Sequence, residues 1–409
     1  ALFGTLTVPL LYLTSRQLGD KRAALTAALL LALSPLHTGE SHDLRMYTLL
    51  TVDFLVLLWA AVKVILKPQK PFLYAVLAAI SALAMLYTQY VSVVFLAALL
   101  LTVLPYCWRS RRALTALAIA MVLIVAGFLP WFPSIRHSAS QRVLFTEENV
   151  SLDRLAATLV VFAAGQVQTQ KAVRSPSERL DLVTLAGGAT LLFGLAVSLG
   201  FRRKHRLTWL LVATGFGPML LLYTASYIKP FYQTYPLMPS LIPLCLLAGL
   251  GLAQLKLPSR AVLLGLLCLV SLALITYGYY DPTLQRNRGL GRVAQVIWEQ
   301  SRPGDVVLCD GLFLWPLQAH LLGLLPDKQL RIEAVSPDRF EATGRFWLVS
   351  RVHRTEVRAE IPADRKQLWE WHQPFGSLLI GRVMLALYST DPQDEKPAAT
   401  PDYLLLPDS

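Results

Sequence analysis

Long apolar windows recur along the first 280 residues of this sequence, and they constrain the fold more than any other feature. Each runs for about 17–20 residues, the length that a helix needs to cross a hydrocarbon core. We expect about ten spans, at residues 1–16, 22–36, 45–62, 72–87, 90–106, 113–130, 181–200, 207–225, 235–254 and 261–279. Only 16% of the residues are charged, against about 25% in soluble domains. The sequence therefore predicts a mainly α protein, a polytopic bundle of membrane helices.

The net charge of +12 does not indicate nucleic-acid binding, because the cations gather in five short loops between the apolar windows. The loops carry Arg16, Lys21 and Arg22; Lys63, Lys67 and Lys70; Arg109, Arg111 and Arg112; Arg202, Arg203, Lys204 and Arg206; and Lys256 and Arg260. They alternate with loops poor in cations, and Lys and Arg accumulate on the cytoplasmic side of a membrane. We therefore expect these five loops in the cytoplasm and both ends of the chain outside it. A soluble bundle would not segregate charge in this way.

The cysteines and the standard catalytic motifs say little. The four cysteines suggest no disulfide pair and no metal knuckle. The pair Gly289 and Gly291 lacks the third glycine and the preceding strand of a dinucleotide fingerprint, and there is no P-loop, HExxH or GxSxG. The chain opens directly on an apolar window at Ala1, so we expect a trimmed chain or a fragment.

Two parts of the sequence are too polar to span. We expect residues 131–180 to form a long outward loop, in which residues 151–165 form a helix on the membrane surface with Ser151 at its N-cap. Residues 280–389 alternate helical and strand-like segments and predict a small extracytoplasmic α/β domain. We expect strands at 306–309, 330–335, 345–352 and 378–389, and helices at 290–300, 312–322 and 363–371. Residues 390–409 are rich in Pro and Asp and predict a loose tail.

Ionisable side chains gather in SPLHTGESHDLRMY, residues 34–47, between two apolar windows: His37, Glu40, His42, Asp43 and Arg45. A charged group costs about 2.5–3.5 kcal/mol at the centre of a span on insertion scales, so we place the segment at the outer membrane interface. One interpretation makes Asp43 and Arg45 interfacial caps, since a carboxylate is favourable at a helix N-terminus. The other makes them part of a site. A spacing of five places the two histidines on different helical faces, which argues against a shared metal ion.

Other outward connections are also rich in polar and aromatic groups. Tyr87, Gln89 and Tyr90 join the fourth and fifth windows; Trp131, Arg136 and His137 follow the sixth; and Tyr227, Lys229, Tyr232, Gln233 and Tyr235 join the eighth and ninth. Aromatic residues at an interface ordinarily form an anchoring belt. Basic groups on the outer face need another explanation, and Arg45 and Lys229 together could clamp a phosphate with Asp43 close by.

Five segments carry a family resemblance. ALSPLHTGESHDLRMYTLLTVDFLVLL resembles a segment of bacterial protein-mannosyltransferases, the glycosyltransferase family 39 group, whose members often read SP-h-x-x-x-SQEARMYxLLxL. LYTQYVSVVFLAALL resembles their YTHYFxxLVLLAQ, and FLPWFPSI their xLPWLPxL. SYIKPFYQTYPLMPSLIPLCLLAGLGLAQL resembles their RPxFxxRYLLPxLPxLxLLxAxGLxxL. VAQVIWEQSRPGDVVLC is similar to their outward helix followed by a PGDxVL turn. The segments occur in the family's order and cover nearly the whole chain.

The resemblance implies a GT-C-type membrane glycosyltransferase that takes a sugar from a polyprenyl-phosphate carrier on the outer face of a bacterial plasma membrane. Its acceptor would be a protein, lipid or glycan, and no nucleic acid is involved. By position, Asp43 takes the place of the family's acidic residue, Arg45 and Tyr47 match its RMY, and Lys229 falls in the phosphate-side loop. The set of substrate-binding candidates is Glu40, Arg45, Tyr47, Tyr87, Gln89, Tyr90, Lys229 and Tyr235. No cofactor is expected for certain, and a divalent cation held by Asp43 is an open option.

The sequence departs from the family at two points. Thr234 stands where many members have arginine before the tyrosine, which would weaken or rearrange the phosphate contacts. The family's first span and first outward loop, with its key catalytic aspartate, would lie upstream of Ala1. Two alternatives therefore stay open: a transporter or flippase, and a non-catalytic homologue. Prolines such as Pro105, Pro130 and Pro230 lie mainly at the ends of windows, unlike the mid-membrane interruptions of transporters.

Overall fold

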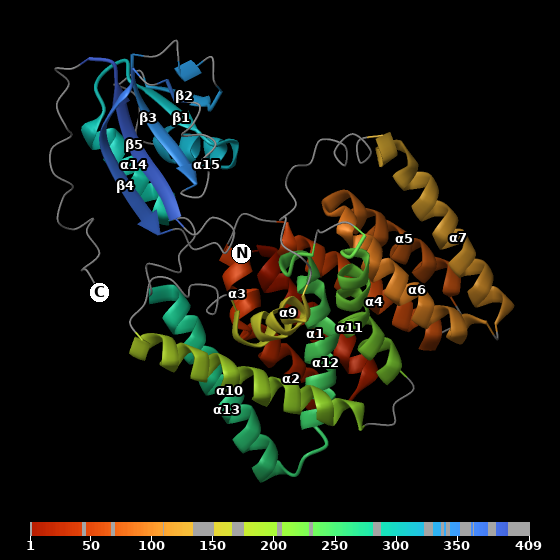
Figure 1. Ribbon diagram of the computed structural model, residues 1–409. Helices are drawn as coiled ribbons and strands as arrows, with labels where there is room; N and C mark the ends of the chain where they lie inside the picture. The colour runs from red at the N-terminus through yellow and green to blue at the C-terminus, as the bar shows by residue number, and fades with distance from the viewer. Residues whose placement is uncertain are drawn as a thin grey trace. The chain divides into compact units, whose positions relative to one another are not determined.

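The computed structural model describes most of the chain. The described residues are 2–42, 46–66, 70–108, 110–133, 151–165, 176–202, 207–228, 232–280, 288–322, 330–336, 339–340, 344–351, 361–362, 364–374 and 382–391. The chain forms two compact units, one of Ala1–Gln166 with Val183–Thr276 and one of Val167–Leu182 with Tyr277–Ser409. The first unit is helical and the second contains a sheet (Figure 1).

The first unit is a bundle of apolar helices. Its elements are α1 (Leu2–Leu18), α2 (Lys21–Ala32), α3 (Pro35–His42), α4 (Tyr47–Leu66), α5 (Pro71–Thr88), η1 (Tyr90–Ser92), α6 (Val93–Cys107), α7 (Arg111–Phe128), η2 (Leu129–Trp131), α9 (Leu152–Ala164), α10 (Pro176–Phe201), α11 (Thr208–Ala225), η4 (Tyr235–Ser240), α12 (Leu241–Leu252) and α13 (Leu257–Tyr280). Among the described residues, 8 helical segments are long and apolar enough to cross a membrane. They coincide with the last eight predicted windows.

The second predicted span differs from the structure, whereas the first coincides with α1. Helix α1 has 17 residues, and the window predicted at 22–36 is divided between α2, with 12 residues, and α3. Asp20 caps α2 by accepting the Ala23 N–H at 2.8 Å, and Pro35 begins a new helix. At 1.5 Å per residue, α2 is only about 18 Å long, short of the roughly 30 Å of a hydrocarbon core.

Helix α12 is the core of this unit. All of its residues are buried, and it packs against α2 and α11. A Cβ atom at Gly249 would lie 2.7 Å from the carbonyl oxygen of Ala23, so only glycine allows α2 and α12 to come this close. Small residues at helix crossings are typical of membrane bundles, where close backbone packing replaces the hydrophobic effect.

Helix α9 confirms the helix predicted at 151–165. Ser151 is the N-cap residue, as predicted, with extended backbone angles of φ −114° and ψ 158°, and its side chain makes no capping hydrogen bond. The helix buries Thr158, Val161 and Phe162 on one face and packs against α3.

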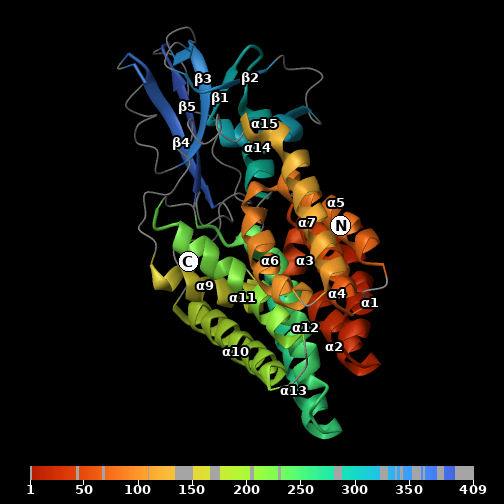
Figure 2. The ribbon, with the colours of Figure 1, turned by 90° about the vertical axis from the view of Figure 1, so that its right-hand side faces the viewer.

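The second unit is an α/β layer. Its elements are α14 (Arg288–Gln300), β1 (Val306–Cys309), α15 (Gly311–Leu322), β2 (Arg331–Ala334), β3 (Arg345–Arg351), β4 (Lys366–Pro374) and β5 (Arg382–Ser389). The strand order is β2-β1-β3-β5-β4, which Figure 2 shows from one edge to the other. β2, β1 and β3 are parallel, and β5 and β4 are antiparallel to their neighbours. α14 and α15 cover one face through a core that includes Ile297, Phe313 and Trp347.

A buried carboxylate supports this sheet. Asp305, in the turn before β1, accepts hydrogen bonds from Trp347 Nε1 at 3.0 Å and from the Arg302 N–H at 3.0 Å. It also pairs with Arg345 Nε at 3.1 Å. The charge is thereby compensated where it is buried, which links the turn after α14 to strand β3.

The helix predicted at 363–371 is wrong, because the structure has strand β4 there. β4 pairs antiparallel with β5, with a register shift between Gln367 and Trp369. Lys, Gln, Leu and Glu favour helices locally. Pairing with β5 and the burial of the Leu368 side chain, which is 5% exposed, override that preference. The tail predicted at 390–409 lies outside the described residues except for 390 and 391.

Candidate functional site

Helix α3 contains the first part of the ionisable segment found in the sequence. Pro35 is its first residue, where a missing N–H costs nothing, and the Ser34 hydroxyl accepts the His37 N–H at 3.3 Å. The helix buries Leu36, His37 and Glu40, with His37 3% and Glu40 1% exposed. A spacing of three places His37 and Glu40 on one face of the helix. Two ionisable side chains are therefore buried within one helix of eight residues.

Two glycines allow α3 to fit between α1 and α9. A Cβ atom at Gly4 in α1 would collide with the Ser41 hydroxyl. Gly165, which ends α9, has φ +72°, and a Cβ atom there would lie 2.9 Å from Cβ of Pro35. The Ser41 hydroxyl donates to the carbonyl oxygen of His37 at 2.6 Å. The position of α3 is thus fixed from both sides by close backbone contact.

Burial decides the charge of His37. It lowers the pKa of His37 to about 4, so this imidazole is neutral at pH 7. No described residue makes a hydrogen bond with its Nε2 atom. His42, at the end of the same helix, is exposed. The two histidines therefore lie in different environments, in line with their spacing.

Tyr47 and Tyr235 come together although they are far apart in the sequence. Tyr47 begins α4 and is 7% exposed. Tyr235 begins η4, which packs against α4. The two rings stack with centroids 6.0 Å apart and an interplanar angle of 29°. The structure thus joins the start of the fourth helix to the connection before α12, two regions that the sequence analysis assigned to one site.

The segment before η4 is attached to α9 by hydroxyl groups. The Thr158 hydroxyl donates to the Arg154 carbonyl oxygen at 2.9 Å. It also lies 2.8 Å from the Tyr232 hydroxyl and 3.1 Å from the Thr234 hydroxyl. A hydroxyl has one proton and two lone pairs, so Thr158 accepts from both partners. Thr234, which replaces an arginine of the resembled family, thus has a structural contact here.

Tyrosines extend this attachment to α11. The Tyr232 ring packs edge-on against Tyr223, with centroids 6.0 Å apart, and the Tyr223 hydroxyl lies 2.7 Å from that of Tyr227. Burial raises the pKa of Tyr232. Sequence reasoning missed Thr158 altogether, because nothing local in LDRLAATLVV indicates a contact 74 residues away.

The remaining candidates divide into three groups. Tyr87 is 46% exposed, donates its hydroxyl proton to the Gly127 carbonyl oxygen at 2.7 Å, and packs against Phe128 and Trp131. These contacts direct it toward the end of α7 and fit an aromatic anchor. Gln89 ends α5 with extended angles, Tyr90 begins η1, and both are partly exposed. Asp43, Arg45 and Lys229 lie outside the described residues.

The comparisons with known proteins agree with this architecture. Residues 1–132 match the family model described as dolichyl-phosphate-mannose-protein mannosyltransferase. Two crystal structures of ArnT from Cupriavidus metallidurans share the fold at 14% sequence identity and a TM-score of 0.55. The apo structure covers 94% of this chain and 82% of that chain, and the structure bound to undecaprenyl phosphate covers 97% and 84%. No curated protein matches the chain.

These findings identify the fold and a resemblance over part of the chain. The chain is an integral membrane protein with an ArnT-like fold, and the predicted resemblance to mannosyltransferases is confirmed over residues 1–132. Helix α3, the start of α4 and the Tyr87 region lie within the part that matches the mannosyltransferase model, whereas α9 and Tyr235 lie beyond it.

Proposed function

We propose that this protein is an integral-membrane glycosyltransferase that moves a sugar from a polyprenyl-phosphate donor to a lipid, glycan or protein acceptor. The observation that carries the proposal is that residues 1–132, which include the ionisable segment, match a mannosyltransferase model. The ArnT-like fold over 94% of the chain supports it. The undecaprenyl phosphate bound to one ArnT structure supports a carrier of the same chemical class.

The candidate residues other than Tyr87 have parts in the proposed reaction. Arg45 and Lys229 bind the carrier phosphate, and the planar fork of Arg45 is suited to two of its oxygens. That contact strengthens as negative charge develops on the leaving phosphate. Asp43 supplies a carboxylate that orients the acceptor or holds a divalent cation. Glu40, Gln89 and Tyr90 contribute polar groups around the site.

The tyrosine pair and α9 support these groups in the proposed mechanism. Tyr47 follows the Arg45 segment directly in the sequence, and its stacking on Tyr235 gives the segment a fixed end. Thr158 holds the residues before Tyr235. A site that is held by packed side chains need not reorganise when charge develops, which is the main source of electrostatic catalysis.

Transfer in reconstituted vesicles tests the proposal. We would supply polyprenyl-phosphate-linked sugars with a radiolabel in the sugar and measure free polyprenyl phosphate together with labelled acceptor. Transfer should fall in Asp43→Asn and Arg45→Ala, and it should persist in His42→Gln, a matched change at an exposed neighbour. Movement of intact labelled carrier across the bilayer without loss of sugar would instead identify a flippase. No consumption of any donor would favour a non-catalytic homologue.

The proposed reaction takes place on the outer face, with the α/β unit outside the cytoplasm. The support is the alternation of basic loops in the sequence. Cysteine labelling with a membrane-impermeant reagent tests this orientation at two exposed positions, Arg302→Cys and Lys256→Cys. We expect the first to label in intact cells and the second only after permeabilisation. The opposite pattern would overturn the orientation.

A further inference from the structure

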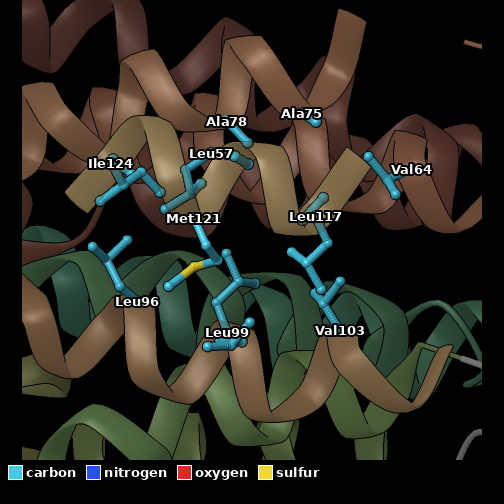
Figure 3. Close-up of a pocket in the computed structure, with 14 residues that line it drawn as sticks. Leu57, Val64, Ala75, Ala78, Leu96, Leu99, Val103, Leu117, Met121 and Ile124 are labelled. Atoms are coloured by element: carbon cyan, nitrogen blue, oxygen red, sulfur yellow. The ribbon is translucent and has the colours of Figure 1, made fainter. Parts of the chain in front are cut away.

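An apolar cavity of about 80 Å³ lies between α4, α5, α6 and α7 (Figure 3). Each helix contributes one stretch of lining residues: Leu57 to Val64, Ala75 to Ala82, Leu96 to Val103, and Leu117 to Ile124. Figure 3 shows Leu99, Leu117 and Met121 converging on this space from two helices. Each stretch covers about 10 Å of helix axis at 1.5 Å per residue. The cavity therefore runs along the helices.

Alanines create the cavity. Ala75, Ala79, Ala116 and Ala120 form a small buried cluster where α5 and α7 pack closely. The neighbouring Ala78 and Ala82 on α5 line the cavity, and their short side chains leave its width unfilled. All the helices involved are among the candidate membrane spans. In a membrane, the hydrocarbon chains of lipids surround such helices and can fill an apolar space between them. Filling is favourable because the atoms that line an empty space lose dispersion contacts.

One acidic residue, Asp53, lies on α4 a helical turn before the cavity-lining residue Leu57. The two side chains therefore share a face of the helix. Its Oδ2 atom is shielded from solvent, and no described residue makes a hydrogen bond with it. Ionisable residues inside spans are costly and mark ligand paths or paired groups. The site in the preceding section does not use Asp53.

The charge of Asp53 selects the occupant. A carboxyl group accepts a hydrogen bond from a hydroxyl or an ammonium group, and it repels a phosphate or a second carboxylate. We propose that the cavity binds a hydrocarbon chain of a membrane lipid whose hydroxyl or amine group donates to Asp53. One water-sized volume takes about 10–15 Å³ on the same measure, so the cavity has room for several carbon atoms. It therefore receives one segment of the hydrocarbon chain and not the whole chain. None of the lining residues is among the candidates for the phosphate site, and the proposal does not depend on the proposed transfer.

Photolabelling tests the proposal in phosphatidylcholine nanodiscs. The probe is hexadecanol with a diazirine at mid-chain, and mass spectrometry of peptides locates the crosslinks. We expect crosslinks in the α4 and α6 stretches that line the cavity. Ala78→Phe fills the cavity and should abolish them. The control is Leu101→Phe, which changes an exposed residue of α6 (Leu101 66% exposed) outside the lining and should leave them unchanged.

The polar half of the proposal has its own test. Asp53→Leu should lower crosslinking by roughly tenfold or more, the loss of one hydrogen bond to a charged group. Among unlabelled competitors with the same chain, hexadecanol and hexadecylamine should displace the probe, and palmitate and hexadecyl phosphate should not. Asp53→Asn keeps a hydrogen-bond acceptor but removes the charge. In this variant hexadecanol should still displace the probe, and hexadecylamine should displace it no better than hexadecanol does. Crosslinks unaffected by Ala78→Phe, or displacement by the phosphate as effective as by the alcohol, would overturn the proposal.

Discussion

The hydroxyl of Thr158 is the point at which α9 holds the segment that carries Tyr235, and Thr158→Val removes it without changing the shape of the side chain. The hydroxyl is fully buried and uses all of its hydrogen-bonding capacity on Arg154, Tyr232 and Thr234. Valine leaves two donors without an acceptor. Thr234 is partly exposed and regains a bond with water, whereas Tyr232 is buried and does not.

The loss of stability in Thr158→Val follows from the burial of the Tyr232 hydroxyl, which cannot reach water. A typical hydrogen bond contributes about 0.5–1.5 kcal/mol, and a buried donor left without a partner costs about 1–3 kcal/mol. The sum predicts a loss of about 2–4 kcal/mol from the free energy of unfolding of the helical unit. For a unit of this size, the loss lowers Tm by roughly 5–15 °C. Thr158→Ser keeps the hydroxyl and should remain close to the parent.

Thermal unfolding in detergent and transfer activity give independent measurements. Activity should decline in Thr158→Val at a temperature where the protein is still folded, because the Tyr235 segment loses its attachment while the fold persists. A Thr158→Val protein that melts and transfers like the parent would show that α9 contributes nothing to the position of that segment, and the reasoning would be wrong.

The remaining predictions concern the ionisable segment. The folded state keeps His37 neutral down to about pH 4, so its contribution to stability is present above the unfolded pKa of about 6.5 and is lost as the pH falls toward 4. The loss approaches about 3 kcal/mol over that window, and unfolding measured between pH 4 and 7 should show it in the parent and in His42→Gln but not in His37→Gln. Arg45→Ala should lower transfer by about 10–150-fold, the loss of roughly 1.5–3 kcal/mol from a charge-assisted contact, with partial recovery in Arg45→Lys. Equal transfer at equal expression would make Arg45 an interfacial anchor. Asp43→Asn should leave folding intact and depress transfer by roughly ten- to a thousand-fold, with Asp43→Glu retaining some activity; an active Asp43→Asn protein would reduce Asp43 to a helix cap.

The apolar windows predicted the bundle well because a span is a local property. Length and hydrophobicity within about 20 residues decide whether a helix can cross a hydrocarbon core. The window at 22–36 failed where a second local signal, Pro35, divided it between two helices. The helix predicted at 363–371 was wrong because a distant contact, and not a local signal, decides the structure there. The partner of β4, strand β5, lies elsewhere in the chain, and nothing in RKQLWEWHQ announces that pairing.

The residues of the candidate site were predictable only where polar side chains occurred in the outward connections of the sequence and the structure also brings those connections into contact. Outward polar residues were grouped by the side of the membrane that they were expected to face, which selected Tyr235. The family resemblance selected Tyr47, and the structure stacks the two rings. The same grouping selected Tyr87, whose hydroxyl bonds to the Gly127 carbonyl oxygen. Facing the same side does not make two residues neighbours, because helix packing decides lateral position. Asp53 was overlooked since an acid within an apolar window reads as part of a span.

The site therefore depends on α9, which no motif marked as functional. Helix α3 and the start of α4 belong to one part of the sequence, and Tyr232 to Tyr235 belong to another. Two contacts of α9 connect these parts: Gly165 lies against Pro35, and Thr158 holds Tyr232 and Thr234. The positive φ of Gly165 suits glycine best, since other residues are strained there. A substitution at Gly165 should thus displace α3 while the tyrosine stack persists, and one at Thr158 should release the stack while α3 stays in place. Because these two effects act through different residues of one helix, comparing them would show whether transfer depends on α3, on Tyr235, or on their being held together.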